Sequence, residues 1–178
     1  MNATAILAAI IVGAAASLAH CPAAPGQWAR LPESAPHKVS VVSATRISCD
    51  GVVCQLLGVA EPADEARAAL AKKFAEEYFR QFGGYFSIYN SSHPLSASDG
   101  TPIVWVIGHG NGGALNTELV RAGYLAPKLE AFPDYSFTMP GKQGEYVARW
   151  REQLRQAAND ARDGKPPILP HPIGWKPH

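Results

Sequence analysis

The chain has 178 residues, a formal net charge of +1 and a hydrophobic content of 47%. This length fits one domain of roughly 130 to 150 residues behind a detachable N-terminal segment. Because the net charge is close to zero, the composition excludes a dedicated nucleic-acid binder with a strongly basic surface, although it leaves room for a local basic groove.

The N-terminal segment has the composition of an export signal. Residues 4–19 carry no charged side chain and are rich in Ala, Ile and Leu, while Ser17 and Ala19 supply the small residues of a cleavage site. The run is short for a membrane span, which needs about 20 residues. We therefore expect residues 1–19 to be a signal peptide or a membrane anchor, and the protein to be exported to the periplasm or the extracellular space. A membrane tether through residues 4–19 is the alternative to cleavage.

Residues 20–37 are rich in Pro and Ala and are predicted to be a linker.

The domain is expected to begin with a strand hairpin. Val39, Val41, Thr45 and Ile47 stand at alternating positions, which is typical of a half-buried strand. Asp50-Gly51 predicts a turn, and the sequence VVCQLLGV that follows it predicts the returning strand.

Helices and strands then alternate along the chain. An amphipathic helix over residues 63–82 is predicted by apolar side chains at every fourth position: Ala66, Leu70, Phe74, Tyr78 and Phe82. A short strand, YFSIY, and a nearly continuous apolar strand over residues 101–110 follow, and the second of these is expected to be central. Next comes a two-turn helix, with Asn116 as its N-cap and Gly123 at its end. The last helix is predicted from a stripe that ends before Gly164: Val147, Trp150, Leu154, Ala158 and Ala161. Residues 170–178 form a Pro-rich tail.

Gly108, Gly110 and Gly113 have the G-x-G-x-x-G spacing of a dinucleotide-binding loop. Such a loop needs a helix long enough to cross back over the sheet and deliver a second parallel strand. Here the helix has only about eight residues before Gly123, and Asn111-Gly112 is typical of a two-residue hairpin turn. We therefore interpret the glycines as a turn.

Cys49 and Cys54 flank the sequence DGVV, and an oxidising compartment would allow them to pair. A two-residue turn would set Cys49 opposite Val52 and place Cys54 diagonally at about 7–8 Å, slightly too far for a disulfide. A four-residue turn would set the two cysteines opposite each other. We predict a Cys49–Cys54 disulfide, with two free buried thiols as the alternative. No metal site is predicted, because no second Cys/His pair has ligand spacing.

This order of elements fits an α+β fold, an OB-type five-stranded Greek-key barrel with three helices. Three segments carry a resemblance to a known family: QLLGVAEP at residues 55–62, the helix DEARAALAKKFAEEYF that follows, and LNTELVRAGYLA at residues 115–126. They resemble the staphylococcal-nuclease-like (thermonuclease) family, and the third segment is the most specific. The resemblance covers residues 38–169 and implies an SNase-like OB-fold domain there.

Members of that family typically hydrolyse phosphodiester bonds in DNA or RNA with calcium, so the resemblance implies a particular set of side chains. Carboxylates hold the cation, a glutamate positions the attacking water, and two arginines stabilise the charge on the phosphate. The family's set is absent at every position that can be aligned. The arginines are replaced by Gln55 and by Thr101 or Pro102, the aspartates by Ala44 and Ala60, and the glutamate by Ala63.

Neighbouring residues are candidates for a relocated site. Glu61, Asp64 and Glu65 could offer carboxylates to a cation, with Arg46 and Arg67 nearby. The structural alternative is that Asp64 and Glu65 fit the first turn of the helix, where the helix dipole favours negative charge, and that the arginines are solvated. No catalytic residue is assigned, and Gln55, Glu61 and Asp64 are the catalytic candidates.

Phe132, Tyr135 and Phe137 cluster where this family places aromatic residues near its nucleotide pocket. They could stack on a base or cover the barrel end. Gln55, Phe132 and Tyr135 are therefore the candidate ligand-binding residues.

The sequence thus predicts an exported SNase-like domain that has lost phosphodiesterase activity and serves as a binding or structural module, without an assigned cofactor. The alternative is a calcium-dependent endonuclease acting on DNA or RNA through a relocated acidic site. Nucleic acid is suggested as a partner by the family resemblance alone.

Overall fold

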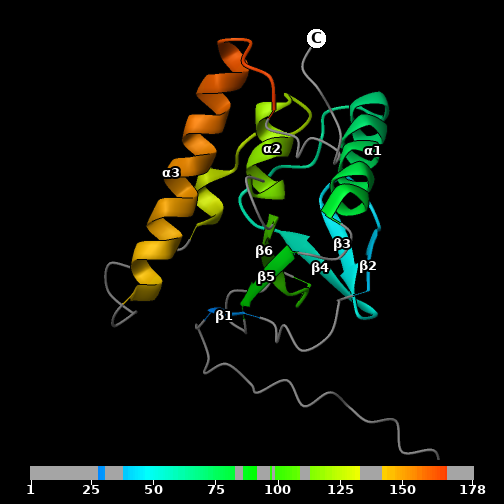
Figure 1. Cartoon of the computed structure of the whole chain (residues 1–178), viewed down its shortest axis with the longest axis vertical. Coiled ribbons are helices and arrows are strands. Elements are labelled where there is room, and N and C mark those ends of the chain that lie inside the picture. The colour runs from blue at the N-terminus through cyan, green and yellow to red at the C-terminus, as the bar shows by residue number, and fades with distance from the viewer. Residues whose placement is uncertain are drawn as a thin grey trace, which may run out of the picture.

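The computed structural model describes residues 28–30, 38–82, 86–91, 97, 99–108, 113–132 and 142–167. Within them the fold is α+β, as predicted, with one mixed sheet and three α-helices (Figure 1). The predicted signal or anchor at residues 1–19 and the tail at residues 170–178 lie outside these ranges. Among the residues described, no helix is long and apolar enough to cross a membrane.

The sheet has the strand order β1-β5-β6-β4-β3-β2. Its strands are β1 (Trp28–Arg30), β2 (Val39–Val41), β3 (Arg46–Cys49), β4 (Val52–Leu56), β5 (Phe86–Ser91) and β6 (Ile103–Gly108). Neighbouring strands are antiparallel, except that β4 and β6 run parallel. The prediction of a central apolar strand is confirmed, because β6 lies between β4 and β5 and buries Val104, Trp105 and Val106 completely.

The sheet is open, with β1 and β2 at its two edges, so a closed barrel is not confirmed. β1 pairs with β5 through Trp28–Ser91, Ala29–Asn90 and Arg30–Tyr89. The predicted linker at residues 20–37 therefore contains a strand. Composition gave no sign of it, because the three residues of β1 are ordered by the unpaired backbone groups of the β5 edge rather than by a pattern of their own.

The helices are α1 (Glu65–Phe82), α2 (Leu115–Arg121) and α3 (Lys142–Arg162), with a short 3₁₀ helix η1 (Leu129–Ala131) between the last two. α1 and α3 lie on opposite sides of the molecule with α2 between them (Figure 1). Gly123 ends α2 at a φ of +73°, as predicted, where its N–H donates to the carbonyl of Val120.

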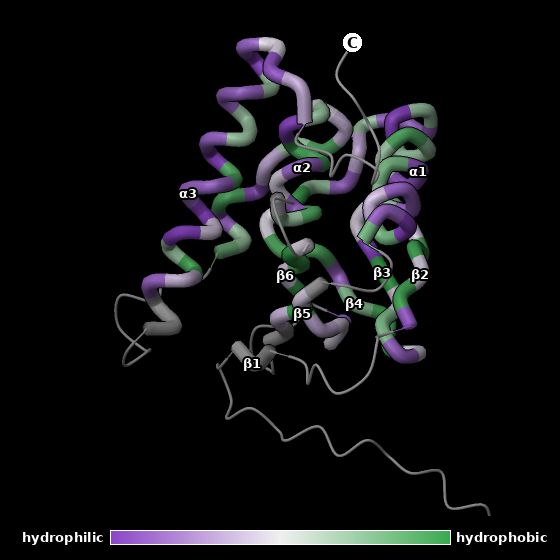
Figure 2. Tube along the Cα trace, viewed as in Figure 1, coloured by the Kyte–Doolittle hydropathy of each residue, from purple (hydrophilic) through white to green (hydrophobic). Residues whose placement is uncertain are grey.

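The buried stripes of α1 and α3 differ in part from those predicted. On α1, Leu70 is 51% exposed, and Ala71 and Ala75 are buried instead. On α3, Ala157 is buried in place of Ala158. A strict four-residue spacing drifts around a helix of 3.6 residues per turn, so it cannot stay on one face over several turns. Polar residues follow the outward side of α3 (Figure 2).

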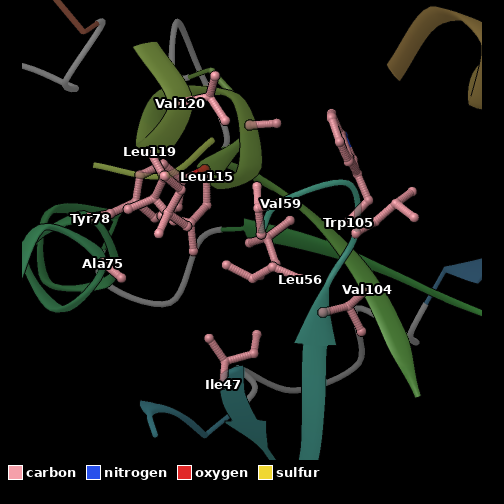
Figure 3. Packing of buried hydrophobic residues seen from close by; sticks show 14 of the residues in the cluster. Ile47, Leu56, Val59, Ala75, Tyr78, Val104, Trp105, Leu115, Leu119 and Val120 are labelled. Carbon is pink, nitrogen blue, oxygen red and sulfur yellow. The ribbon is translucent and has the colours of Figure 1, made fainter. Parts of the chain in front are cut away.

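Core side chains pack on both faces of β6. Tyr78, Leu115 and Leu119 gather on one side, and Trp105 points to the other (Figure 3). There the Trp105 ring stacks on Trp150 of α3, with ring centroids 5.2 Å apart. α3 therefore covers the β5–β6 half of this second face.

Asn116 is not the N-cap of α2, in contrast to the prediction; Ala114 takes that position without a side-chain bond. The Asn116 side chain is fully buried and lies alongside β6, beyond the end of β4. Its amide nitrogen donates to the carbonyls of Val104 (3.2 Å) and Leu57 (3.0 Å), and its oxygen accepts from the N–H of Val106 (3.1 Å). The amide thus bonds to the two residues flanking Trp105, as the peptide groups of a parallel neighbouring strand would.

Close packing explains two of the three glycines in the G-x-G-x-x-G spacing. A Cβ at Gly108 would overlap the ring of Phe82, and one at Gly113 would overlap the carboxylate of Glu118. The Tyr78 hydroxyl also donates to the Gly113 carbonyl at 2.9 Å. Gly108 and Gly113 are therefore needed where α1 and α2 approach the backbone, while Gly110 lies outside the described residues.

Candidate functional site

The outer side of the β3–β4 pair carries Gln55, which the resemblance aligns with an arginine of the nuclease-like family. Gln55 lies opposite Arg46, and Val53 lies opposite Ser48, so these four side chains share one side of the sheet. We refer to them as the Gln55 face. Gln55 is also in register with Ile103 of β6, which puts this face on the same side as Trp105. α3 covers the Trp105 end, whereas Val53 is 41% exposed.

Gln55 and the Thr101–Pro102 segment, which the resemblance aligns with two arginines, lie side by side. The Gln55 N–H donates to the carbonyl of Pro102 at 2.8 Å, and Thr101 precedes Pro102. Neither position carries a cation.

Arg46 is not simply solvated, in contrast to the interpretation from sequence. Its Nη2 donates to Oδ2 of Asp99 at 3.1 Å, and the two side chains are 38% and 47% exposed. Asp99 belongs to the turn before β6, where its Oδ1 accepts the N–H of Thr101 at 2.9 Å. Hydrogen bonds from Thr101, and then the charge of Arg46, lower the pKa of Asp99. Nothing in the sequence signals this pair, because its partners are far apart along the chain.

The Glu61 side chain accepts a structural hydrogen bond. The hydroxyl of Thr45, a fully buried residue, donates to Oε1 of Glu61. This bond fastens the segment before α1 to the turn between β2 and β3. A carboxylate that accepts this bond has one lone pair less for a cation.

Asp64 is the N-cap of α1. Its Oδ1 accepts the N–H of Arg67 at 2.7 Å, and its carbonyl accepts the N–H of Ala68 at 3.0 Å. Within the described ranges, His, Cys, Asp and Glu form no group of three or more that could hold a metal ion. Asp64 thus belongs to the helix start, as the structural alternative expects, while the bond from Thr45 gives Glu61 a separate structural role.

The structure also places the three alanines that the resemblance aligns with acidic residues. Ala44 is buried, and the Ala60 N–H donates to the carbonyl of Ala126 at 2.9 Å. Ala63 is exposed just before α1. None of the three side chains can bind a cation.

Phe132 does not form an exposed stacking surface, in contrast to the prediction. It is 5% exposed, its ring meets the edge of Trp105 at 6.4 Å, and Gly58 lies directly against it. It therefore serves the other role considered, covering one end of the core. Tyr135 and Phe137 lie outside the described residues.

The predicted disulfide is not present: Cys49 and Cys54 are free, buried thiols. Asp50 and Gly51 have φ angles of +51° and +86° and form a two-residue turn, which sets Cys49 opposite Val52. Cys54 is therefore diagonal to Cys49, the geometry that is too long for a disulfide.

We expect both thiols to be unreactive in the folded protein. Burial raises the pKa of Cys49 to about 12, with the charge of Asp50 adding to the shift, and raises the pKa of Cys54 to about 11. Since the thiolate is the reactive form, a Cys21→Ala variant should react with an aromatic disulfide reagent at about pH 8 only after unfolding in urea. Two thiols should then be counted. A count of zero in urea without reductant would contradict the free-thiol assignment.

A scan against models of known protein families finds no match, and a search of curated proteins finds no significant one. A function for this chain is therefore inferred from its residues and their contacts.

Proposed function

We propose that this chain is an exported SNase-like OB-fold domain that has lost phosphodiesterase activity and serves as a binding or structural module. The strand order supports the fold. An OB-fold is a partly open five-stranded Greek-key barrel in which a three-stranded meander joins the fifth strand, and the fifth joins the fourth. β2, β3, β4, β6 and β5 follow that order, with the parallel pair where the meander meets the fifth strand.

One observation carries the functional part of the proposal. The carboxylates nearest the lost catalytic positions are engaged elsewhere, Glu61 by Thr45 and Asp64 by the start of α1. Removal of one transition-state donor typically costs about 10²- to 10³-fold in rate. Loss of two arginines, the base and the metal ligands removes far more than one donor, so a retained role in binding or structure is favoured over hydrolysis. The uncharged residues 4–19 support export.

We expect the purified full-length chain to leave single-stranded DNA and RNA intact, both with calcium and with a chelator. Calcium should also leave the thermal midpoint unchanged, because a ligand stabilises a protein only if it binds the folded state. Calcium-dependent cleavage that survives repurification would overturn the proposal.

Two isosteric variants identify a relocated site if cleavage is seen. Asp64→Asn keeps an oxygen to cap α1 and removes the charge, and Glu61→Gln keeps an oxygen for Thr45. A sharp loss of cleavage in both would assign the activity to these carboxylates. Asp163→Asn, an exposed carboxylate at the end of α3, is the matched control and should leave any activity unchanged.

A further inference from the structure

The Gln55 face holds several polar groups that the fold does not use. Within the described part of the chain, Arg46 donates only to Asp99, through one of its five N–H groups. The side-chain amide of Gln55 and the hydroxyl of Ser48 have no hydrogen-bond partner among these residues. A guanidinium, an amide and a hydroxyl therefore stand side by side on a partly exposed sheet surface.

These groups are placed by the sheet rather than by flexible loops. Arg46 and Gln55 are direct cross-strand neighbours, and Ser48 follows Arg46 on the same side of β3. Asp99 holds the guanidinium by a single bond at Nη2, and both partners are well exposed. Exposed ion pairs of this kind contribute little free energy, so Asp99 orients Arg46 and leaves it able to bind a second partner.

We propose that the Gln55 face binds a carboxylate group, with Arg46 as its principal ligand and the Gln55 amide as a second donor. The inference rests on the proposed function, since it names the ligand chemistry of the same face. A carboxylate is planar and can accept two parallel N–H groups of a guanidinium. Asp99 stays on Nη2 and leaves the remaining N–H groups for the ligand.

Charge favours a single carboxylate over a nucleic acid. Asp99 already neutralises Arg46, and Glu61 bonds to Thr45, the residue before Arg46. Polyanion binding depends on several cations that neutralise successive phosphates. One guanidinium that already pairs with Asp99 can hydrogen-bond a monoanion through its remaining N–H groups, but it lacks the field for a phosphate chain.

The test is a titration of the full-length chain followed in ¹H–¹⁵N spectra, at the Arg46 Nε–H and the Gln55 side-chain amide. The probes are acetate, N-acetylglycine as a peptide C-terminus, N-acetylglycinamide as its uncharged match, and oligothymidylate. We expect saturable shifts with N-acetylglycine at about 10 mM or below and none with the amide. Acetate binding as tightly as N-acetylglycine would assign a free small acid as the ligand; weaker acetate binding would assign a peptide terminus.

Three variants make the test specific. Arg46→Gln should abolish binding, while Arg155→Gln, which breaks a comparable exposed pair on α3, should leave it unchanged. Asp99→Asn keeps one oxygen for the Thr101 N–H and removes the charge that competes for Arg46, so affinity should rise by up to about fivefold.

No saturable shift with either carboxylate, or oligothymidylate binding more tightly than both, would overturn the inference. Such a result in a chain that cleaves nothing would leave the proposed function standing. Cleavage would reject the proposed function whatever the titration shows.

Discussion

Asn116→Ala is expected to lower the free energy of unfolding by about 3 kcal/mol, because a buried group left without its partner costs about 1–3 kcal/mol. The substitution removes the acceptor for the Val106 N–H and the donor for the Leu57 carbonyl, both next to the fully buried core of β6. The Val104 carbonyl keeps the N–H of Leu57 as a second donor, so it contributes less.

Urea denaturation of the wild type and the variant measures this difference. Asn159→Ala is the matched control, because Asn159 is a partly exposed helix residue whose side chain contacts the exposed Arg162. Its cost should stay within about 0.5 kcal/mol. Equal losses in the two variants would mean that the Asn116 amide does not act as a strand neighbour.

Gly58→Ala is expected to destabilise the fold by a similar amount, about 3 kcal/mol, from backbone strain and overpacking together. Gly58 has a φ of +72°, and a Cβ there would lie 2.5 Å from Leu154 Cδ1 and overlap the ring of Phe132. The ring is itself confined by Trp105, so it has little freedom to move.

Gly123→Ala separates the two causes. Gly123 has nearly the same φ, +73°, but a Cβ added there would meet no side chain or distant backbone atom within 4 Å. This control should therefore cost only the left-handed strain, about 1–2 kcal/mol. The thermal midpoints of both variants check the comparison, and equal shifts would show that the Phe132 contact relaxes freely.

Local patterns predicted the elements that depend on local chemistry. The turn at Asp50-Gly51 and the glycine at the end of α2 lie where expected. The alternation from Val39 to Ile47 predicted a single strand, whereas the segment forms two antiparallel strands, β2 and β3, joined by a turn. The same patterns did not give β1, because its pairing with β5 depends on a strand about sixty residues away. Whether Cys49 and Cys54 can form a disulfide depends on the length of the turn between them. A difference of two residues in this turn changes a directly facing pair into a diagonal one.

The candidate site was only partly visible in the sequence. Spacing alone put Glu61 and Asp64 near the positions that the resemblance aligns with catalytic residues, but it could not show that Thr45 and the α1 backbone already use them. The Arg46–Asp99 pair was invisible for the same reason, since it joins β3 to a turn that only the sheet brings near. Phe132 had aromatic chemistry suited to binding, yet burial decides its role.

The hydrogen bonds of the Asn116 amide couple the unfolding of α2 to the unfolding of the sheet. Because a helix side chain completes the bonding of β6, α2 cannot unwind without exposing backbone groups of the central strand. Such shared bonds merge neighbouring elements into a single cooperative unfolding unit. The amide proton of Val106 should accordingly exchange with solvent only when α2 and β6 separate together, and its protection would report the joint stability of helix and sheet.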